Sequence, residues 1–494
     1  MFKFARKNIN KIILSASVPT IIGIFLYNDK KNIFAHQEII NEKPIVIVGG
    51  GIMGSSIAAS IASKGGQVIL IDESHNVRSS WGDTRGLQNG YTGIYGKLVK
   101  RSKRLWEKLQ LEDDNNSNLN HGRGRLFFQS SNMLILPSKE EAIKVKNEHI
   151  ANGHGTNINL FNKDQAETAF SAVKFEKNEV GFVDYNCLAI NAPECLNAMQ
   201  DKAEAHGAII NLSERVDKIN TSKCELLTNN NNRIQYSKLI LASGPWTNRT
   251  LKSANLSQLP IFVSAEQLLY LEPKKNNNIK KNANNYYSIS KMPVIDGEIT
   301  NITADGVTKK SFVYCFPMVP GGKKAFKCAV HCMGEFLHTS DFHVVPGSSP
   351  LNFIDPTVYH RKTLNTRQPN VDEIDNYQKA IVTSFVKTHL PTLNFETPKM
   401  ICRCLYTSAI DLDFIIGPHP EDKNVIICTG FRGEGFKFAP VIGDCVSEIV
   451  LSSSLPKNID NNSSRYDDDD AEELKVLTEE LLKKCSPARF FYKE

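Results

Sequence analysis

The stretch that decides the fold is PIVIVGGGIMG, residues 44–54. Residues 44–48 form a short β-branched, apolar run typical of a buried strand, and the glycines after it match the pattern G-x-G-x-x-G. Residues 55–64 show a helical pattern, which two glycines end, and residues 67–72 indicate a second strand. This order of strand, glycine turn, helix and strand predicts one βαβ unit.

Each glycine of the pattern has a physical role in binding a pyrophosphate. Gly49 allows the tight turn, Gly51 lets the ligand approach the backbone, and Gly54 lets helix and strand pack closely. The helix N-terminus, at Ile52 and Met53, favours the anion. Asp72 ends the second strand, 23 residues after Gly49, at the spacing of a ribose hydroxyl acceptor. The unit therefore predicts a dinucleotide site; Asp72 argues against a 2′-phosphate, but the motif alone does not decide between NAD and FAD.

The remaining patterns predict an α/β + α+β protein with two domains. A strand–glycine–helix pattern returns at residues 424–451, so we expect a discontinuous Rossmann-like domain. We assign it residues 43–128, 177–258 and 398–455. The second domain, built on a mainly antiparallel sheet, comprises residues 129–176 and 259–397, and residues 456–494 are expected to form a solvated acidic and helical tail.

Composition excludes some classes of function. The chain has 494 residues, with 59 Lys+Arg and 53 Asp+Glu, and a net charge of +6 is too small a bias for a dedicated nucleic-acid binder. Its 11 Cys show no CxxC pairs and no metal-ligand spacing. We therefore expect neither a disulfide scaffold nor a metal site.

The pattern of residues 1–42 predicts a targeting segment or a membrane anchor. The start is basic and free of acidic residues, and an apolar run at residues 12–27 follows it. Sixteen residues are slightly short for a bilayer span, and Pro19 interrupts them. We favour mitochondrial targeting. An anchor that associates with a membrane through residues 12–27, a secretory signal and an unstructured tail remain alternatives.

Three further segments carry a resemblance to a known family. They are SSWGDTR at 79–85, YCFP at 314–317 followed by Lys327 and His331, and the C-terminal set CLYT, FIIGPHP and GFRGEGFKF between 404 and 438. In this order the chain resembles the monomeric sarcosine oxidase family from about residue 44 to residue 451. That family includes N-methyltryptophan and sarcosine/pipecolate oxidases, within the glycine/D-amino-acid oxidase class of flavoproteins.

The resemblance implies a monomeric FAD-dependent amine oxidase. Such an enzyme oxidises the C–N bond of a secondary amine, such as sarcosine or pipecolate, passes electrons to O2 and releases an imine and hydrogen peroxide. The resemblance further implies that Cys404 holds FAD covalently, that Lys327 activates oxygen and that Lys437 pairs with the substrate carboxylate. It places His331 and Tyr314 in the active site and Arg85 beside the flavin ring. Further residues expected at the cofactor are Thr84, Val216, Gly433, Gly435 and Phe436.

The sequence departs from the family pattern at the substrate end of the site. Trp81 stands where the pattern has a histidine, and Gln88 stands where it has a second carboxylate-binding arginine. Arg432 replaces a serine and Glu434 a histidine. Either Arg432 replaces the missing arginine, or Glu434 faces a cationic group of a different substrate. We expect Gln88, Arg432 and Glu434 to contact the substrate, and we expect sarcosine to be poorer than a larger or more highly charged amine.

Two other functions fit the same fold. One is a dehydrogenase that passes electrons to a mitochondrial carrier; Lys327 argues for oxygen instead. The other is a non-enzymatic, flavin-binding assembly factor; Cys404, Lys327 and Tyr314 together in one chain argue against it.

Overall fold

The computed structural model describes most of the chain. It covers residues 43–73, 79–80, 82–115, 124–155, 157–274, 287–302, 308–331, 335–336, 376–452 and 468–491. Residues 1–42, with the apolar run 12–27, lie outside these ranges, as does Trp81. The predictions made on them, mitochondrial targeting and membrane association, therefore stay predictions. Among the described residues, no helix has both the length and the apolar character needed to cross a bilayer.

A six-stranded sheet forms the first lobe. Its order is β18 (Ile415–His419), β19 (Asp422–Thr429), β11 (Lys238–Leu241), β1 (Ile45–Val48), β2 (Val68–Ile71) and β7 (Ile209–Asn211). All neighbours are parallel except β18 and β19. Helix α2 (Ile52–Ser63) packs between α7 (Ala192–Ala205) and α12 (Ala439–Leu451). Strands from distant parts of the sequence thus form one Rossmann-like sheet, as predicted.

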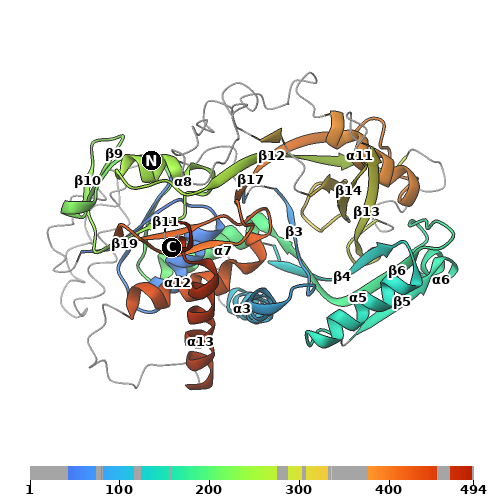
Figure 1. Ribbon diagram of the computed structural model, residues 1–494, viewed down its shortest axis with the longest axis horizontal. Helices are drawn as coiled ribbons and strands as arrows, with labels where there is room; N and C mark the ends of the chain where they lie inside the picture. The colour runs from blue at the N-terminus through green and yellow to red at the C-terminus, as the bar shows by residue number, and fades with distance from the viewer. Residues whose placement is uncertain are drawn as a thin grey trace, which may run out of the picture.

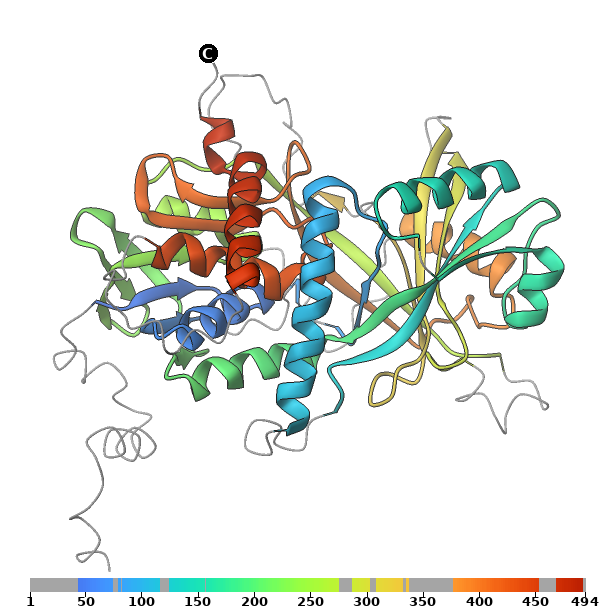
Figure 2. The same cartoon turned by 90° about the horizontal axis from the view of Figure 1, so that it is seen from below.

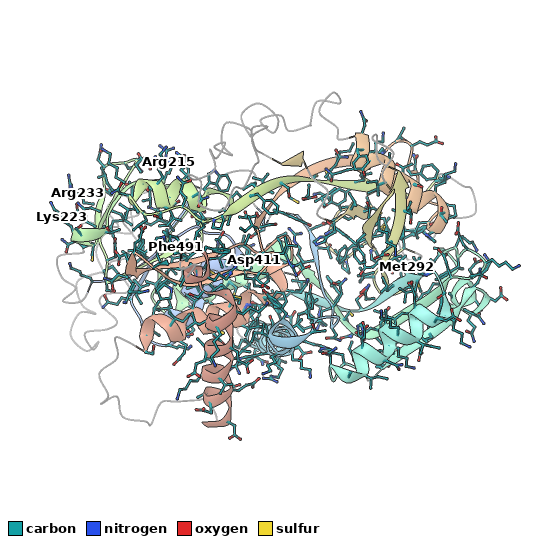
Figure 3. The ribbon with its side chains drawn as sticks, in the orientation of Figure 1. Arg215, Lys223, Arg233, Met292, Asp411 and Phe491 are labelled. Atoms are coloured by element: carbon teal, nitrogen blue, oxygen red, sulfur yellow. The ribbon has the colours of Figure 1, made fainter. Side chains whose placement is uncertain are left out.

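A small antiparallel sheet extends this lobe. It consists of β8 (Val216–Asn220), β9 (Glu225–Thr228) and β10 (Arg233–Gln235). Lys223 and Arg233 mark this end of the molecule, and buried Met292 lies in the opposite lobe (Figure 3).

A ten-stranded sheet dominates the second lobe (Figure 1). Its main path is β16 (Glu335–Phe336), β12 (Ile261–Leu271), β15 (Phe326–Val330), β14 (Thr308–Phe316), β13 (Val294–Ile302), β4 (Phe127–Leu136), β6 (Val180–Asn191) and β3 (Thr84–Leu87). Strand β17 (Met400–Ala409) pairs with β12, and β5 (Ile158–Asn162) with β6. Every pair is antiparallel except β13 and β4, so the predicted sheet type is confirmed. Because β3, β6 and β17 fall in segments assigned to the first domain, this sheet joins the lobes, and the domain boundaries remain a prediction.

The two faces of the ten-stranded sheet have different roles because successive side chains point to opposite sides of a strand. One face carries Met133, Ile295, Val313 and Cys328, which form a core under helix α11 (Asn376–His389). The alternate residues of the same strands face the cavity described below. Because the core-facing side chains are buried under α11, the alternate side chains of these strands must point into the cavity.

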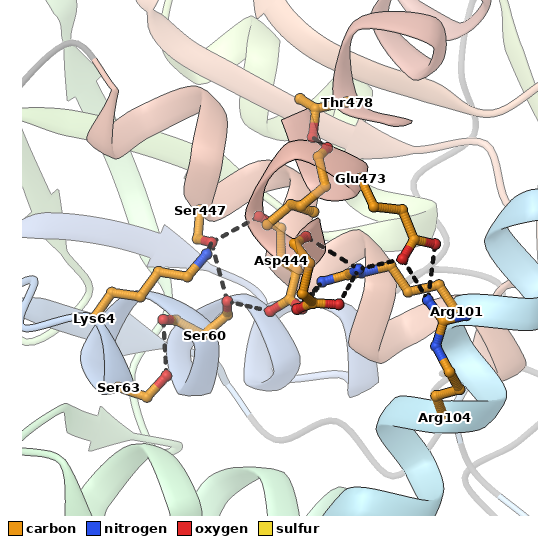
Figure 4. Close-up of polar contacts among 11 residues, drawn as sticks. Ser60, Ser63, Lys64, Arg101, Arg104, Asp444, Ser447, Glu473 and Thr478 are labelled. Carbon is orange, nitrogen blue, oxygen red and sulfur yellow. Dashed lines mark hydrogen bonds and ion pairs between the residues drawn. The ribbon is translucent and has the colours of Figure 1, made fainter. Parts of the chain in front are cut away.

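The C-terminal helix is part of the core of the first lobe. Helix α13 (Asp468–Cys485) buries Leu474, Leu477 and Leu481 and runs beside α3 (Gly93–Asn115) (Figure 2). Arg101 of α3 is 1% exposed and makes hydrogen bonds of 2.7 and 2.9 Å to the two oxygens of Asp470. Figure 4 shows Arg101 beside Asp444 and Glu473, which lie 3.9 and 3.3 Å from its guanidinium group. The expectation of a solvated tail is wrong for this helix, because its leucines recur at helical spacing and need a partner surface.

Candidate active site

The glycine turn after β1 has the geometry that its motif requires. Gly49 has a φ of +115°, and a Cβ there would lie 2.4 Å from the Ala242 carbonyl oxygen. A Cβ on Gly54 would lie 1.8 Å from the Gly49 carbonyl oxygen. A Cβ on Gly51 would meet only the Ser80 hydroxyl, at 3.2 Å. Gly49 and Gly54 are therefore required by the backbone, whereas the space at Gly51 is available to a ligand.

The first cavity opens at the carboxyl ends of the parallel strands. It is lined by Val48 at the end of β1, Asp72 after β2, Ala242 after β11 and Thr429 at the end of β19. This is the usual place for a ligand in an open α/β sheet. Asp72 accepts a hydrogen bond of 2.7 Å from the Gly50 amide. The remaining predicted cofactor residues on this cavity are Gly49, Gly51, Ile52, Met53, Arg85, Val216, Gly433, Gly435 and Phe436.

These residues fit a dinucleotide. Gly51 provides a bare backbone surface at the start of α2, and Asp72 provides an acceptor at the end of β2. The cavity continues to Leu405 and Thr407 of β17, so it reaches the ten-stranded sheet.

A second cavity adjoins the first. Both are lined by Ser79, Arg85, Gly433 and Phe436. Its floor is the ten-stranded sheet, which contributes residues at alternating positions: Phe182 and Asp184, Asn132 and Leu134, Asp296, Phe312, Tyr314 and Phe316, Lys327, Leu268, and Cys404 and Tyr406. Thr84, Gln88, His331, Glu434 and Lys437 complete the predicted site residues on this cavity.

Lys327 is a buried cation on this floor. Its side chain is 4% exposed, its Nζ donates to the Thr84 carbonyl, and it lies 4.4 Å from the centre of the Phe316 ring. Thr84 belongs to β3, and four strands separate β3 from β15 in the sheet order, so the sheet curves strongly around the cavity. Burial and the nearby Arg85 lower the pKa of Lys327 to about 7, against the opposing charge of Asp83.

Cys404 and Tyr314 lie on the same cavity. Burial raises the pKa of the Cys404 thiol to about 12, against the lowering effect of Arg85 and Lys327. Burial also raises the pKa of the Tyr314 phenol, so both groups are neutral near pH 7. Cys404 is therefore a protonated thiol whose nearest positive charges are Arg85 and Lys327.

Lys437 reaches the cavity from the short helix η5 (Gly435–Phe438). Its backbone carbonyl accepts hydrogen bonds from the Ser102 hydroxyl and, at 3.1 Å, from the Trp106 indole, both on α3. Its Nζ donates to the Tyr91 hydroxyl. The position of this cation is thus set by α3, the helix that Arg101 ties to α13.

Comparison with known proteins decides the family. The model of the FAD dependent oxidoreductase family matches residues 44–449. The chain is a member of this family. It is 24% identical over 421 residues to the monomeric sarcosine oxidase of Bacillus sp. (strain B-0618), covering 84% of this chain and 94% of that protein. It is 24% identical over 426 residues to the human peroxisomal sarcosine oxidase, covering 82% and 91%.

Solved structures support the fold of this FAD dependent oxidoreductase. NikD, described as an unusual amino acid oxidase essential for nikkomycin biosynthesis, matches with a TM-score of 0.63 at 17% identity, over 88% of this chain and 97% of that one. The expected sarcosine oxidase-like family and the enzyme class, an FAD-dependent oxidoreductase acting on CH–NH groups, are confirmed. FAD rather than NAD is therefore the cofactor.

The substituted residues of this oxidoreductase form a local ion pair. Arg432 donates to Glu434 at 3.2 and 3.3 Å, and His331 Nε2 lies 3.7 Å from the other Glu434 oxygen. Burial alone would raise the pKa of Glu434, but His331, Lys437 and Arg432 together lower it to about 2. Glu434 lines the second cavity as a charged but paired carboxylate, and Arg432 lines neither cavity.

Gln88 hydrogen-bonds an acid that the sequence did not single out. Its Nε2 donates at 2.9 Å to Asp296 of β13. Other lining residues that the sequence analysis missed are Ser80, Glu73, Arg215, Trp246, Arg249, Tyr91, Asn132, Asp184 and Tyr406. Trp246 and Arg249 follow the end of a parallel strand, a position that could have identified them. Nothing local marks Asp296 or Asn132.

One residue predicted at the cofactor, Gly54, has a packing role. Gly54 lines neither cavity and instead packs on Gly49. Within the described residues no cluster of three or more His, Cys, Asp or Glu could hold a metal ion.

Proposed function

We propose that this chain is an amine oxidase that removes two electrons from the C–N bond of a secondary amine and transfers them to O2. The substrate class would be an N-methyl amino acid or a cyclic imino acid, or a larger or more highly charged relative of these. The products would be an imine, which water hydrolyses, and hydrogen peroxide. The observation that carries the proposal is a buried cation, Lys327, on the floor of the cavity that adjoins the dinucleotide cavity.

The residues of both cavities supply binding and orientation. Gly51, the start of α2 and Asp72 would hold the pyrophosphate and ribose of FAD, and Arg85 and Phe436 would hold the ring end, where the cavities meet. Bound FAD supplies the two-electron redox chemistry. Lys437 would bind a carboxylate of the substrate, and Tyr314 would orient it from the floor.

Lys327 suits reduction of oxygen. Negative charge develops on oxygen when it accepts electrons, and a fixed cation in a site of low polarity stabilises such charge more strongly than water does. With a pKa of about 7, Lys327 can also release a proton near neutral pH. The Thr84 carbonyl and the Phe316 ring hold its Nζ in place.

The test is to mix the flavin-loaded protein with a panel of secondary amines without oxygen, and then to admit oxygen. The proposal expects bleaching of the flavin by at least one amine, followed by peroxide in equal amount when oxygen returns. Bleaching with no peroxide would support the dehydrogenase instead. A loaded flavin that no amine bleaches would support the assembly factor.

Covalent attachment through Cys404 has a matched control on the same strand. Cys402 lies two residues away on the same face of β17 and is also buried. We expect Cys404→Ser to release FAD on denaturation and Cys402→Ser to retain it, measured as flavin fluorescence of the denatured polypeptide. Retention by both variants would contradict attachment at Cys404. Mitochondrial location and action as a monomer remain predictions.

A further inference from the structure

Asp296 is a buried acid on the floor of the second cavity. It lies on β13 opposite Tyr314 of β14 and is 4% exposed. Gln88 and Asn132 donate to its Oδ2 at 2.9 and 2.8 Å. Its Oδ1 is buried, and no group of the described ranges forms a hydrogen bond with it. Among the described residues, no Lys or Arg is within ion-pair distance of either oxygen.

The other acids of this cavity are already satisfied. Glu434 is paired with Arg432, 3.2 Å away. Asp184 accepts hydrogen bonds from the Asn89 amide group at 3.0 Å and from the Asn186 backbone at 2.8 Å, one on each oxygen. Asp296 is therefore the acid that has an unused oxygen.

Burying a charged carboxylate without a paired cation costs free energy, and this cost raises the pKa of the carboxyl group. Burial raises the pKa of Asp296 to about 7, even though the positive charges of Lys437 and His331 act in the other direction. A cationic ligand group at Oδ1 would remove this cost. The arrangement of Gln88, Asn132 and Asp296 is therefore suited to binding a cationic group.

We propose that Asp296 binds a second cationic group of the substrate, so that the substrate is a secondary amine carrying a further protonated amine. This inference rests on the proposed function. Asp296 lies two strands from Lys327 in the sheet order, roughly 10 Å at the usual strand spacing. It therefore receives a group some bonds away from the C–N bond that reacts near Lys327. Gln88 serves as a positioning residue here, in place of an arginine that would attract a carboxylate.

The experiment compares two amines of the same shape. N-methyl-1,4-diaminobutane and N-methylpentylamine differ in whether the far end is an ammonium or a methyl group. Apparent affinities come from the rise in the melting temperature of the flavin-loaded protein with ligand concentration. Anaerobic flavin bleaching is recorded separately. The proteins are the wild type, Asp296→Asn, and the matched Asp184→Asn, which neutralises a carboxylate in the same cavity.

We expect the wild type to bind the diamine at least about tenfold more tightly than the monoamine, the usual size of one charge-assisted hydrogen bond. Asp296→Asn should abolish this preference without weakening the monoamine, and Asp184→Asn should keep it. Equal affinities in the wild type, or an equal loss for both amines in Asp296→Asn, would overturn the inference. Binding and bleaching are measured separately, and sarcosine is included in the bleaching assay. If sarcosine bleaches the flavin but the wild type shows no preference for the diamine, the proposed function stands and this inference fails.

Discussion

The chemistry of the site rests on single residues whose properties come from burial. Lys327 is the clearest case, because burial and Arg85 hold its pKa near 7 while Asp83 opposes them. Asp83 is itself fixed by a hydrogen bond of 2.8 Å from Tyr270. The charge of Lys327 thus depends on Arg85, which lines the cavity, and on Asp83, which Tyr270 of β12 holds behind it.

Replacing Lys327 should slow oxygen use more than substrate oxidation. We expect Lys327→Met to lower the rate of flavin reoxidation by O2 on the order of 10²-fold and to change anaerobic bleaching much less. The exposed Lys324→Met is the control, because it removes a cation that lines neither cavity. Stopped-flow absorbance measures both half-reactions. Equal slowing of both would show that Lys327 only supports the fold of the site.

The same residue predicts a dependence on pH. Lys327 is protonated below its pKa of about 7 and neutral above it. The reoxidation rate should therefore fall as pH rises through about 7 in the wild type and should lose this step in Lys327→Met. A wild-type rate that rises over this range would contradict the assignment.

Alanine substitutions at Gly51 and Gly54 should have different effects, on FAD affinity and on stability respectively. A Cβ on Gly54 meets the Gly49 carbonyl oxygen at 1.8 Å, so Gly54→Ala should destabilise the protein with or without FAD. A Cβ on Gly51 meets only Ser80, so Gly51→Ala should keep the melting temperature of the apoprotein but bind FAD at least about tenfold more weakly. Thermal melting and FAD titration separate the two. Normal FAD affinity in Gly51→Ala would argue against the predicted pyrophosphate position.

At the scale of elements, helix α13 links the C-terminus to the active site. Arg101 binds Asp470 of α13, and the next residue, Ser102, donates to the carbonyl of Lys437. Trp106 on the same helix adds a second hydrogen bond to that carbonyl. Packing of α13 on α3 therefore stabilises the segment that places Lys437.

Removing a core leucine of α13 should measure this contribution. Leu481 is fully buried, so Leu481→Ala should lower the free energy of unfolding by about 2–5 kcal/mol. Val476 on the same helix is 45% exposed, and Val476→Ala should change it by less than about 0.5 kcal/mol. Urea denaturation measures both. Equal effects would mean that α13 does not pack on the first lobe in solution.

At the scale of the whole molecule, the first cavity, expected to hold FAD, lies between the two lobes. Gly49 and Asp72 line it from the six-stranded sheet, and Leu405 and Thr407 line it from β17 of the ten-stranded sheet. A ligand in this cavity contacts both sheets at once. Its binding energy is therefore added to the stability of the assembled molecule.

Removing FAD should thus lower the melting temperature of the whole protein. We expect FAD to be removable from the Cys404→Ser variant by dialysis. This variant should then regain stability as FAD is added, by about 2.7 kcal/mol at a free concentration 100 times Kd. The double variant with Gly51→Ala should regain less at the same concentration. Calorimetry measures the transition. A melting temperature independent of FAD would contradict binding between the lobes.

Much of the fold was predictable because its signals are local. Residues 44–72 contain the strand, turn, helix and strand of one unit. Strand β19 and helix α12 likewise form where the sequence has a strand–glycine–helix pattern. The burial of α13 was not predicted. The acidic start of that helix suggested solvent, whereas Leu474, Leu477 and Leu481 find their partners on segments far away in the sequence.

By itself, the sequence determined the dinucleotide unit, the class of oxidoreductase and the expected positions of Lys327, Cys404 and Lys437. These depend on short motifs, in which neighbours along the chain carry the information. The tertiary structure alone decided that Asp296 accepts hydrogen bonds from Gln88 and Asn132. The reason is physical: strand pairing joins residues 88, 132 and 296 across a curved sheet, and no local pattern specifies which strands become neighbours.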